Sequence, residues 1–433
     1  MSAEINTIQV NEPDIRIRAC DKKALYGLSV LSILFVFLQN NQILNLAAIA
    51  LFLAILAQKD MSTAICSYFY LTTWERFTTM PVLSAISIID MILGFVVVIQ
   101  LIHKRIRIRL DDSVLLCIAC IYSVIALLLH RNMSGIKMIF DVFIVIYIRY
   151  INQDKEDNAD FWKRAFLFIY ISTVLSIMWG FVSYMQGNVA TIYLDGNIHS
   201  RLRSTVGTDR SCMLYCAAAI YPFFYMKKKW LKICSIGLLA TMTLLTLSIT
   251  AMLCASVFCI ILLIDSYRNS KLNKGILAIL IVLILGTFYY VYNYGSGINA
   301  IDNMIIRTKN VSMSASDGKY STATSGRTEI FNDYWYIYSN RFNFFNKLFG
   351  SGVVNYKYDY DLSDYAHNTY MDMLLYMGLI PLIFVIYRFY NGIKYYKNSN
   401  YQLQILLLKT SYALTALSVS MFTATYWWVF FII

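Results

Sequence analysis

A histidine stands where a polar stretch meets an apolar one near the end of the chain. His367, one of 4 histidines in 433 residues, lies in "DYAHNTYMDMLLYMGLIP" (364–381). Histidine can accept and return a proton near neutral pH, which suits a general base. Asp364 or Asp372 could orient the ring. His367 is therefore the first candidate for acid–base chemistry, set against the simpler interpretation of a satisfied structural histidine.

Five arginines gather in two polar stretches upstream. They are Arg201, Arg203, Arg210, Arg327 and Arg341. A guanidinium group stays charged and offers a planar fork of donors that fits phosphate oxygens. Together, just above a bilayer, they could hold a lipid-linked pyrophosphate. For any single arginine, a solvated loop or a lipid headgroup contact is an equally good explanation. His199, in the first of these stretches, is a reserve base.

Composition predicts that a membrane surrounds the elements carrying these residues. The chain is 58% hydrophobic and 14% charged, whereas soluble domains carry about 25% charged residues. Stretches such as 81–102 and 274–294 approach the roughly 20 apolar residues that cross a bilayer. We predict an all-α, polytopic transmembrane helical bundle of about 12–14 spans. The first apolar run, from Ala24, is expected to be a retained span rather than a cleaved signal.

The apolar segments divide the chain into spans and loops. Spans are predicted at 24–40, 42–57, 61–75, 81–102, 113–130, 134–150, 161–186, 211–226, 230–248, 249–267, 274–294, 368–390 and 402–423, with 425–433 part of a short fourteenth. The third is the weakest and could be re-entrant. The corresponding regions are a cytoplasmic N-terminus (1–23), an N-terminal bundle (24–186), a first external loop (187–210), a second bundle (211–294), a large external loop (295–367) and C-terminal helices (368–433).

The distribution of basic residues predicts the orientation. With the N-terminus inside, the inside segments hold 22 lysines and arginines and the short outside segments hold 5. Basic residues accumulate in cytoplasmic loops, so this asymmetry favours that orientation. The orientation in the membrane then explains the net charge of +12, and we expect no nucleic acid partner. Both arginine-bearing loops fall on the external side.

The large external loop is 73 residues long, and loops of that length are usually functional or disordered. Disordered segments are poor in aromatic residues, yet 14 aromatic residues lie between Phe331 and Tyr370. The second half is therefore predicted to be folded. Within it, residues 331–345 are amphipathic and typical of an interfacial helix. The Ser/Thr/Gly-rich segment 310–326 is expected to be mobile.

Two acids, Asp90 and Asp141, fall inside predicted spans. Charges at that depth are costly and usually face a partner or a cavity. They could pair with Lys137 or Arg149 and brace the bundle, which we favour, or belong to a transporter's proton path. The 9 cysteines lie mostly in or beside apolar segments, so we expect no disulfide framework, no zinc site and no other metal.

The large loop and the following span resemble a known family. "SGRTEIF…NKLFGSGVVNY…YAHNTYMDMLLYMGLI" (325–380) is similar to the large-loop signature of the O-antigen polymerase and O-antigen ligase superfamily. The matching residues are Ser325, Gly326, Arg327, Phe349, Gly350, Gly352, Ala366, His367, Asn368, Tyr370, Gly378 and Leu379. "RLRSTVGTDRSCMLY" (201–215) resembles the family's earlier external motif. "LTLSITAML" (245–253) resembles a family helix start, but Ile249 stands where the family has arginine.

The resemblance implies a membrane glycosyltransferase that needs neither metal nor other cofactor. Its donor and acceptor would be undecaprenyl-pyrophosphate-linked oligosaccharides at the outer face of the bacterial inner membrane, with membrane lipid and a chain-length regulator as further candidate partners. His367 would be the base, and Arg327 and Arg203 the first pyrophosphate ligands. The candidate substrate-binding residues are Arg201, Arg210, Arg341, Asn368, Tyr370 and His199.

Three functions compete at this point. A repeat-unit polymerase is favoured, because polymerases tend to be this divergent and tyrosine-rich. A ligase would instead attach the finished polysaccharide to a lipid core. A polysaccharide flippase or exporter predicts buried charges along a central path and short loops. Asp90 and Asp141 weakly favour transport, and the 73-residue loop disfavours it.

Overall fold

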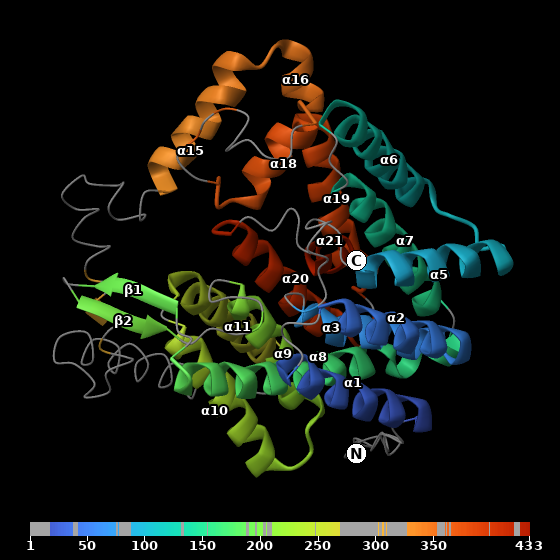
Figure 1. The fold of residues 1–433 in the computed structure, drawn as a ribbon, viewed down its shortest axis with the longest axis vertical. Coiled ribbons are helices and arrows are strands. Elements are labelled where there is room, and N and C mark those ends of the chain that lie inside the picture. The colour runs from blue at the N-terminus through green and yellow to red at the C-terminus, as the bar shows by residue number, and fades with distance from the viewer. Residues whose placement is uncertain are drawn as a thin grey trace, which may run out of the picture.

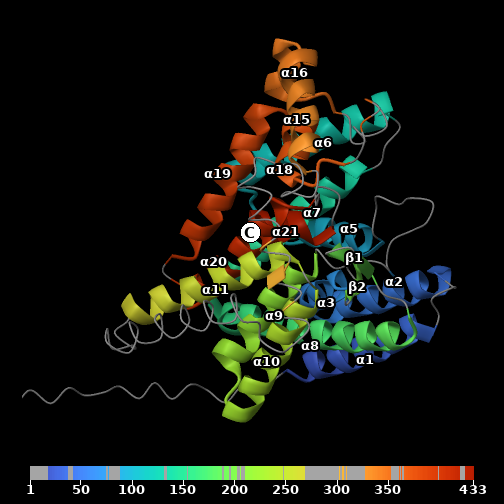
Figure 2. The same cartoon turned by 90° about the vertical axis from the view of Figure 1, so that its left-hand side faces the viewer.

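The computed structural model describes most of the chain as packed helices (Figures 1 and 2). The residues described are 18–37, 42–74, 77, 88–130, 134–153, 155–187, 190–194, 197–201, 205, 210–246, 248–268, 302, 305, 306, 309, 327–352, 360, 362, 365–397, 399–419 and 425–433. The predicted mobile segment 310–326 and the predicted span 274–294 lie outside them. The all-α prediction is confirmed.

The N-terminal half follows the predicted spans. Its helices are α1 (Ala19–Phe37), α2 (Gln42–Lys59), α3 (Met61–Thr72), α5 (Ile88–His103), α6 (Leu110–His130), α7 (Ser134–Gln153) and α8 (Lys155–Met185). A two-stranded antiparallel hairpin, β1 (Ala190–Leu194) and β2 (Asn197–Arg201), follows in the first predicted external loop. This hairpin is an exception to the all-α prediction.

The second half contains shorter and more broken elements. They are α9 (Ser211–Tyr225), α10 (Lys229–Leu245), α11 (Ile249–Arg268), α15 (Arg327–Tyr336), the π-helix η1 (Ile337–Arg341), α16 (Phe344–Phe349), α18 (Thr369–Met377), α19 (Leu379–Tyr395), α20 (Gln402–Ala416) and α21 (Thr425–Ile432). Asp160–Met185 within α8 and Ile249–Arg268 are long and apolar enough to cross a membrane.

Helix α3 lies at the centre of the bundle. It packs against α1, α2, α5, α8 and α21, and each of its 12 residues is buried. At 1.5 Å per residue it is about 18 Å long, which is too short to cross a bilayer of about 30 Å. The third predicted span is therefore a buried core helix, and side chains such as Ser62 and Thr63 find partners in the protein. Thr63 donates to Asp21 at 2.7 Å.

The predicted span 368–390 is divided at one residue. Helix α18 ends at Met377, Gly378 has φ +81°, and α19 begins at Leu379. A left-handed backbone ends an α-helix and is readily adopted by glycine. The hydrophobic run continues across the break, so hydropathy could not reveal it. The eight residues of α21 are likewise too few to span a bilayer alone.

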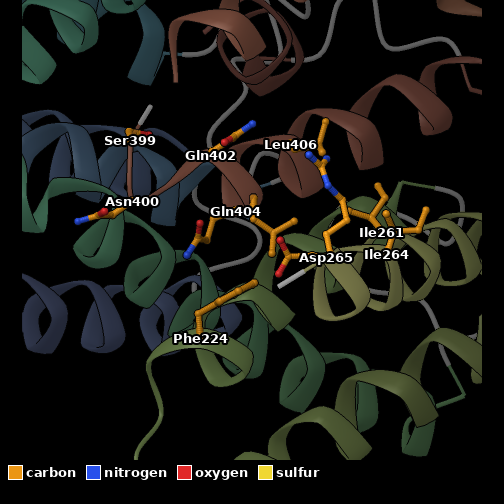
Figure 3. Close-up of a pocket in the computed structure, with 11 residues that line it drawn as sticks. Phe224, Ile261, Ile264, Asp265, Ser399, Asn400, Gln402, Gln404 and Leu406 are labelled. Carbon is orange, nitrogen blue, oxygen red and sulfur yellow. The ribbon is translucent and has the colours of Figure 1, made fainter. Parts of the chain in front are cut away.

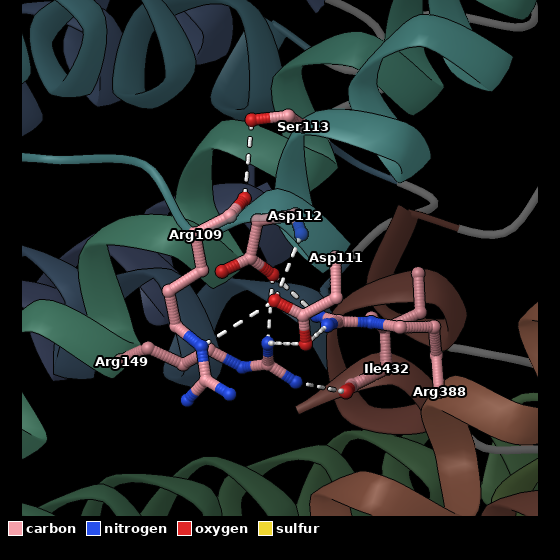
Figure 4. A network of polar contacts seen from close by, with 7 residues as sticks. All are labelled: Arg109, Asp111, Asp112, Ser113, Arg149, Arg388 and Ile432. Carbon is pink, nitrogen blue, oxygen red and sulfur yellow. Dashed lines mark hydrogen bonds and ion pairs between the residues drawn. The ribbon is translucent and has the colours of Figure 1, made fainter.

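A buried ion network joins α6, α7 and α19 (Figure 4). Asp112 accepts from Arg149 at 2.7 Å and from Arg388, which also contacts Asp111. Arg388 is 0% exposed. Arg149 reaches the Ile432 carbonyl at the end of α21 as well, at 3.3 Å. The network therefore ties the C-terminal helix to the bundle.

The acids predicted inside spans are buried between α5 and α7. Asp90 and Asp141 are each 0% exposed and Lys137, one turn from Asp141, is 3% exposed. These positions agree with either bracing or a polar path, so bracing stays a prediction. Arg149, one of the two suggested partners, forms its ion pairs with Asp112 and Asp111.

Candidate active site

The start of α18 holds His367 in an unusual backbone conformation. Its φ is +48°, and Arg105 is the other non-glycine residue with positive φ in the described ranges. Such backbone is uncommon, although histidine tolerates it better than most residues, and it clusters at functional sites. Asn368 follows as the N-cap, and its side chain accepts from the backbone N–H groups of Tyr370 and Met371. The half-buried His367 therefore directly precedes a capped helix start.

Three consecutive residues attach this helix start to the end of α20. The Asn368 amide donates to the Leu417 carbonyl at 3.3 Å, Thr369 to Val419 at 2.8 Å and Tyr370 to Ala413 at 3.1 Å. The last carbonyls of a helix need such partners. Asn368 and Tyr370 were predicted to bind substrate. Their contacts here position His367, and substrate binding by them stays a prediction.

At the other end of α18, the glycines of the loop signature pack backbone against backbone. A Cβ at Gly350 would lie 2.3 Å from the Tyr376 carbonyl oxygen, and one at Gly378 would lie 2.4 Å from the Gly350 nitrogen. Gly350 has φ +73°. The N–H of Gly352 donates to the Tyr376 carbonyl at 2.9 Å. The loop after α16 is therefore joined to the break between α18 and α19.

Tyr122 of α6 completes this junction. Its hydroxyl lies 2.6 Å from the Met377 carbonyl and also contacts the Phe349 carbonyl. Tyr376 donates in turn to the Tyr122 carbonyl at 3.1 Å. No sequence signal pointed to Tyr122, because it lies in an apolar helix more than two hundred residues upstream. It anchors the large loop to the N-terminal bundle.

Replacing Gly350 by alanine should destabilise the protein and loosen the loop. The left-handed backbone alone costs about 1–2 kcal/mol for a residue with a side chain, and the Cβ also overlaps Tyr376. Gly237→Ala is the matched control, because Gly237 lies in α10 with nothing within 4 Å of its Cβ position, where alanine favours helix. Thermal unfolding in detergent should separate the two. Equal midpoints would contradict the close packing at Gly350.

The large loop forms an arch of helices over α18 (Figures 1 and 2). Helix α15 begins at Arg327, runs into η1, and η1 ends at Arg341, so the predicted folding of 331–345 is confirmed. Short π-helical segments are frequent at functional sites. Partial burial raises the pKa of Tyr338 above its ordinary value, and its hydroxyl donates to the Lys347 carbonyl at 3.1 Å.

The two arginines of the arch have different surroundings. Arg327 is half-buried at the first position of α15, whereas Arg341 is exposed. The Arg341 guanidinium lies 5.8 Å from the centre of the Tyr360 ring, a cation–π distance. Phe344 and Phe345 beside it are 78% and 65% exposed, which agrees with an interfacial location.

The first predicted external loop is anchored on the bundle at Thr205. This residue is buried, and its hydroxyl contacts the Thr73 carbonyl and lies 2.7 Å from the Ser176 hydroxyl. Half-buried Arg210 directly precedes α9, so its charge adds to the positive end of that helix dipole. Such a helix start attracts anions.

For two of the remaining candidates in this loop, the structure describes the backbone pairing. His199 pairs with Ile192, and Arg201 with Ala190, across the hairpin. Arg203 lies outside the described residues. Its role as a pyrophosphate ligand, and its meeting with Arg327 and His367, stay predictions.

Both predicted external segments have a contact with the central helices or their neighbours. Thr205 touches the end of α3, and Phe69 of α3 packs against Phe430 of α21 at 4.8 Å between ring centres. The Tyr370 ring lies 6.1 Å from Phe431. Helix α15 lies above the hairpin in Figure 1. A single site shared by the two segments stays a prediction.

A protein-family model matches the part of the chain that contains the large loop. Residues 234–386, about a third of the chain, match the family model described as O-antigen ligase. Residues 234–386 carry an O-antigen ligase family domain. The match supports the O-antigen ligase and polymerase superfamily, a function of that type, and a membrane glycosyltransferase-like enzyme. No curated protein and no solved structure is detectably similar to the chain.

The O-antigen ligase family domain contains only some of the candidate residues. Those inside it are Arg327, Arg341, His367, Asn368 and Tyr370. Those outside are His199, Arg201, Arg203 and Arg210. Tyr122 of the N-terminal bundle and Thr205 of the first predicted external loop also lie outside the domain, so segments before it help to hold the candidate site.

Proposed function

We propose that this protein polymerises undecaprenyl-pyrophosphate-linked oligosaccharide repeat units at the outer face of the inner membrane. The observation that carries the proposal is His367, held in a left-handed conformation before a capped helix that is locked at both ends within an O-antigen ligase family domain. A rigid helix start with a half-buried imidazole suits a general base.

The proposed reaction is a single glycosyl transfer. The acceptor sugar's hydroxyl oxygen forms the new bond to the donor's anomeric carbon, and His367 takes the hydroxyl proton. The old carbon–oxygen bond breaks with its electron pair staying on the lipid pyrophosphate. Arg327, Arg203 and Arg210 stabilise that growing charge, so no metal is required.

A ligase is the second candidate, because the matching family model is described as O-antigen ligase. The two functions differ in what a deletion strain accumulates. Loss of a polymerase leaves single repeat units on the final acceptor, whereas loss of a ligase leaves no attached repeats. Purified protein that lengthens lipid-linked repeats in detergent, without an ion gradient, would establish polymerisation and exclude transport as the primary role.

Arg327→Ala should lower the polymerisation rate about 10²–10³-fold, since removing one donor to a developing negative charge typically has that effect. Arg327→Lys should recover part of the rate, because it keeps the charge and loses the planar fork. Both rates are measured on lipid-linked repeats with the folded fraction checked by size-exclusion chromatography. Full activity in the alanine variant would remove Arg327 from the proposed site.

A further inference from the structure

A cavity of about 660 Å³ lies where α9, α11 and α20 meet, in a region that the proposed reaction does not use (Figure 3). It is lined by the end of α9 (Phe224), the last turns of α11, and the turn into α20. Ile264, Arg268 and Gln402 are exposed, so the cavity opens to the surface. Its size falls within the usual range of small-molecule sites, about 300–1,000 Å³.

Both polar and apolar side chains line the cavity. The polar ones are Asp265, Arg268, Ser399, Asn400, Gln402 and the buried Gln404, and the apolar ones, which form an apolar wall, are Ile261, Ile264, Leu403 and Leu406, with Phe224 opposite. Ile264 is 53% exposed. A cavity lined by both kinds of side chain fits an amphiphile better than it fits a soluble ion.

The chain segments next to the lining residues carry more basic than acidic side chains, although Asp160 also acts on Tyr401 beside the cavity. The described residues of 226–229, 265–268 and 394–402 hold six exposed cations and one carboxylate. The cations are Lys227, Lys228, Lys229, Arg268, Lys394 and Lys397, and the carboxylate is Asp265. Basic clusters on the cytoplasmic side of a membrane protein attract anionic lipid headgroups.

We propose that this cavity binds an anionic phospholipid, with its phosphate against Arg268 and Gln402 and one acyl chain along Ile264 and Leu406. Guanidinium binds phosphate oxygens through paired hydrogen bonds, and Ile264 and Leu406 offer apolar surface to an acyl chain. The positive-inside pattern assigns these three connections to the cytoplasmic side. The lipid would therefore come from the inner leaflet, opposite the proposed reaction.

The test is lipid binding by the detergent-purified, full-length chain, measured by native mass spectrometry and by thermal shift. Phosphatidylglycerol should bind at least about tenfold more tightly than phosphatidylcholine. Arg268→Gln should remove that preference, and Ile264→Trp, which fills the apolar half, should weaken both lipids. Arg107→Gln, an exposed arginine in the connection before α6, is the matched control and should bind like the wild type.

Three results would overturn the proposal. One is equal affinity of the wild type for the two lipids. Another is an Arg268→Gln variant that binds phosphatidylglycerol as tightly as the wild type does. The third is stabilisation by inorganic phosphate as large as that by phosphatidylglycerol, because the apolar wall would then contribute nothing.

Discussion

His367→Ala should lower the rate of glycosyl transfer by about 10²–10⁴-fold, the usual contribution of a positioned general base. The acceptor hydroxyl would keep its place and lose the group that takes its proton. Rates on lipid-linked repeats, with the folded fraction checked for each protein, measure the effect.

A glycine substitution at His367 is a more informative control than the alanine substitution. His367→Gly removes the imidazole and also relieves the left-handed conformation of φ +48°, which costs a side-chain-bearing residue about 1–2 kcal/mol. This variant should unfold at or above the wild-type temperature and still be inactive. Asn368→Ala should instead lose stability, by about 0.5–2 kcal/mol for a lost helix cap. A His367→Gly protein with full activity would exclude His367 as the base.

Arg388→Met should have the largest effect on stability of any substitution considered. Arg388 is 0% exposed and contacts both Asp111 and Asp112. Without Arg388, the two carboxylates share the buried guanidinium of Arg149, and breaking a buried ion pair typically costs about 3–5 kcal/mol. The effect is measured as the change in the free energy of unfolding in mixed micelles. Activity should fall with the folded fraction.

Arg109→Gln is the matched control for this network. Arg109 pairs with Asp111 at 3.4 Å, but its side chain is 51% exposed. Exposed pairs contribute about 0–1 kcal/mol, so this variant should unfold close to the wild type. The double variant Arg388→Met with Asp112→Leu should recover part of the loss, since removing both charges leaves none unpaired. If Arg109→Gln and Arg388→Met lowered the free energy of unfolding by similar amounts, burial would not determine how much each ion pair contributes to stability.

The sequence alone determined the class of protein and much of the external loop. Apolar runs predicted helices near most of the places where the structure has them, because hydropathy over about twenty residues reports burial or lipid contact directly. Aromatic density predicted a folded second half of the large loop, and residues 327–352 are folded there. The family resemblance singled out Gly350, Gly352 and Gly378, and the structure shows that each has a left-handed backbone, which glycine adopts readily. The hairpin in the first loop carried no comparable signal.

Tertiary structure decided how these pieces are joined. Tyr122 meets Phe349 and Met377 across more than two hundred residues, and no local pattern encodes such a partner. Arg149 was a suggested partner of Asp141, yet its ion pairs are with Asp112 and Asp111. Periodicity and hydropathy are properties of neighbouring residues, whereas ion pairs and helix breaks depend on which distant segment packs alongside. The position and rigidity of His367 belong to this second group.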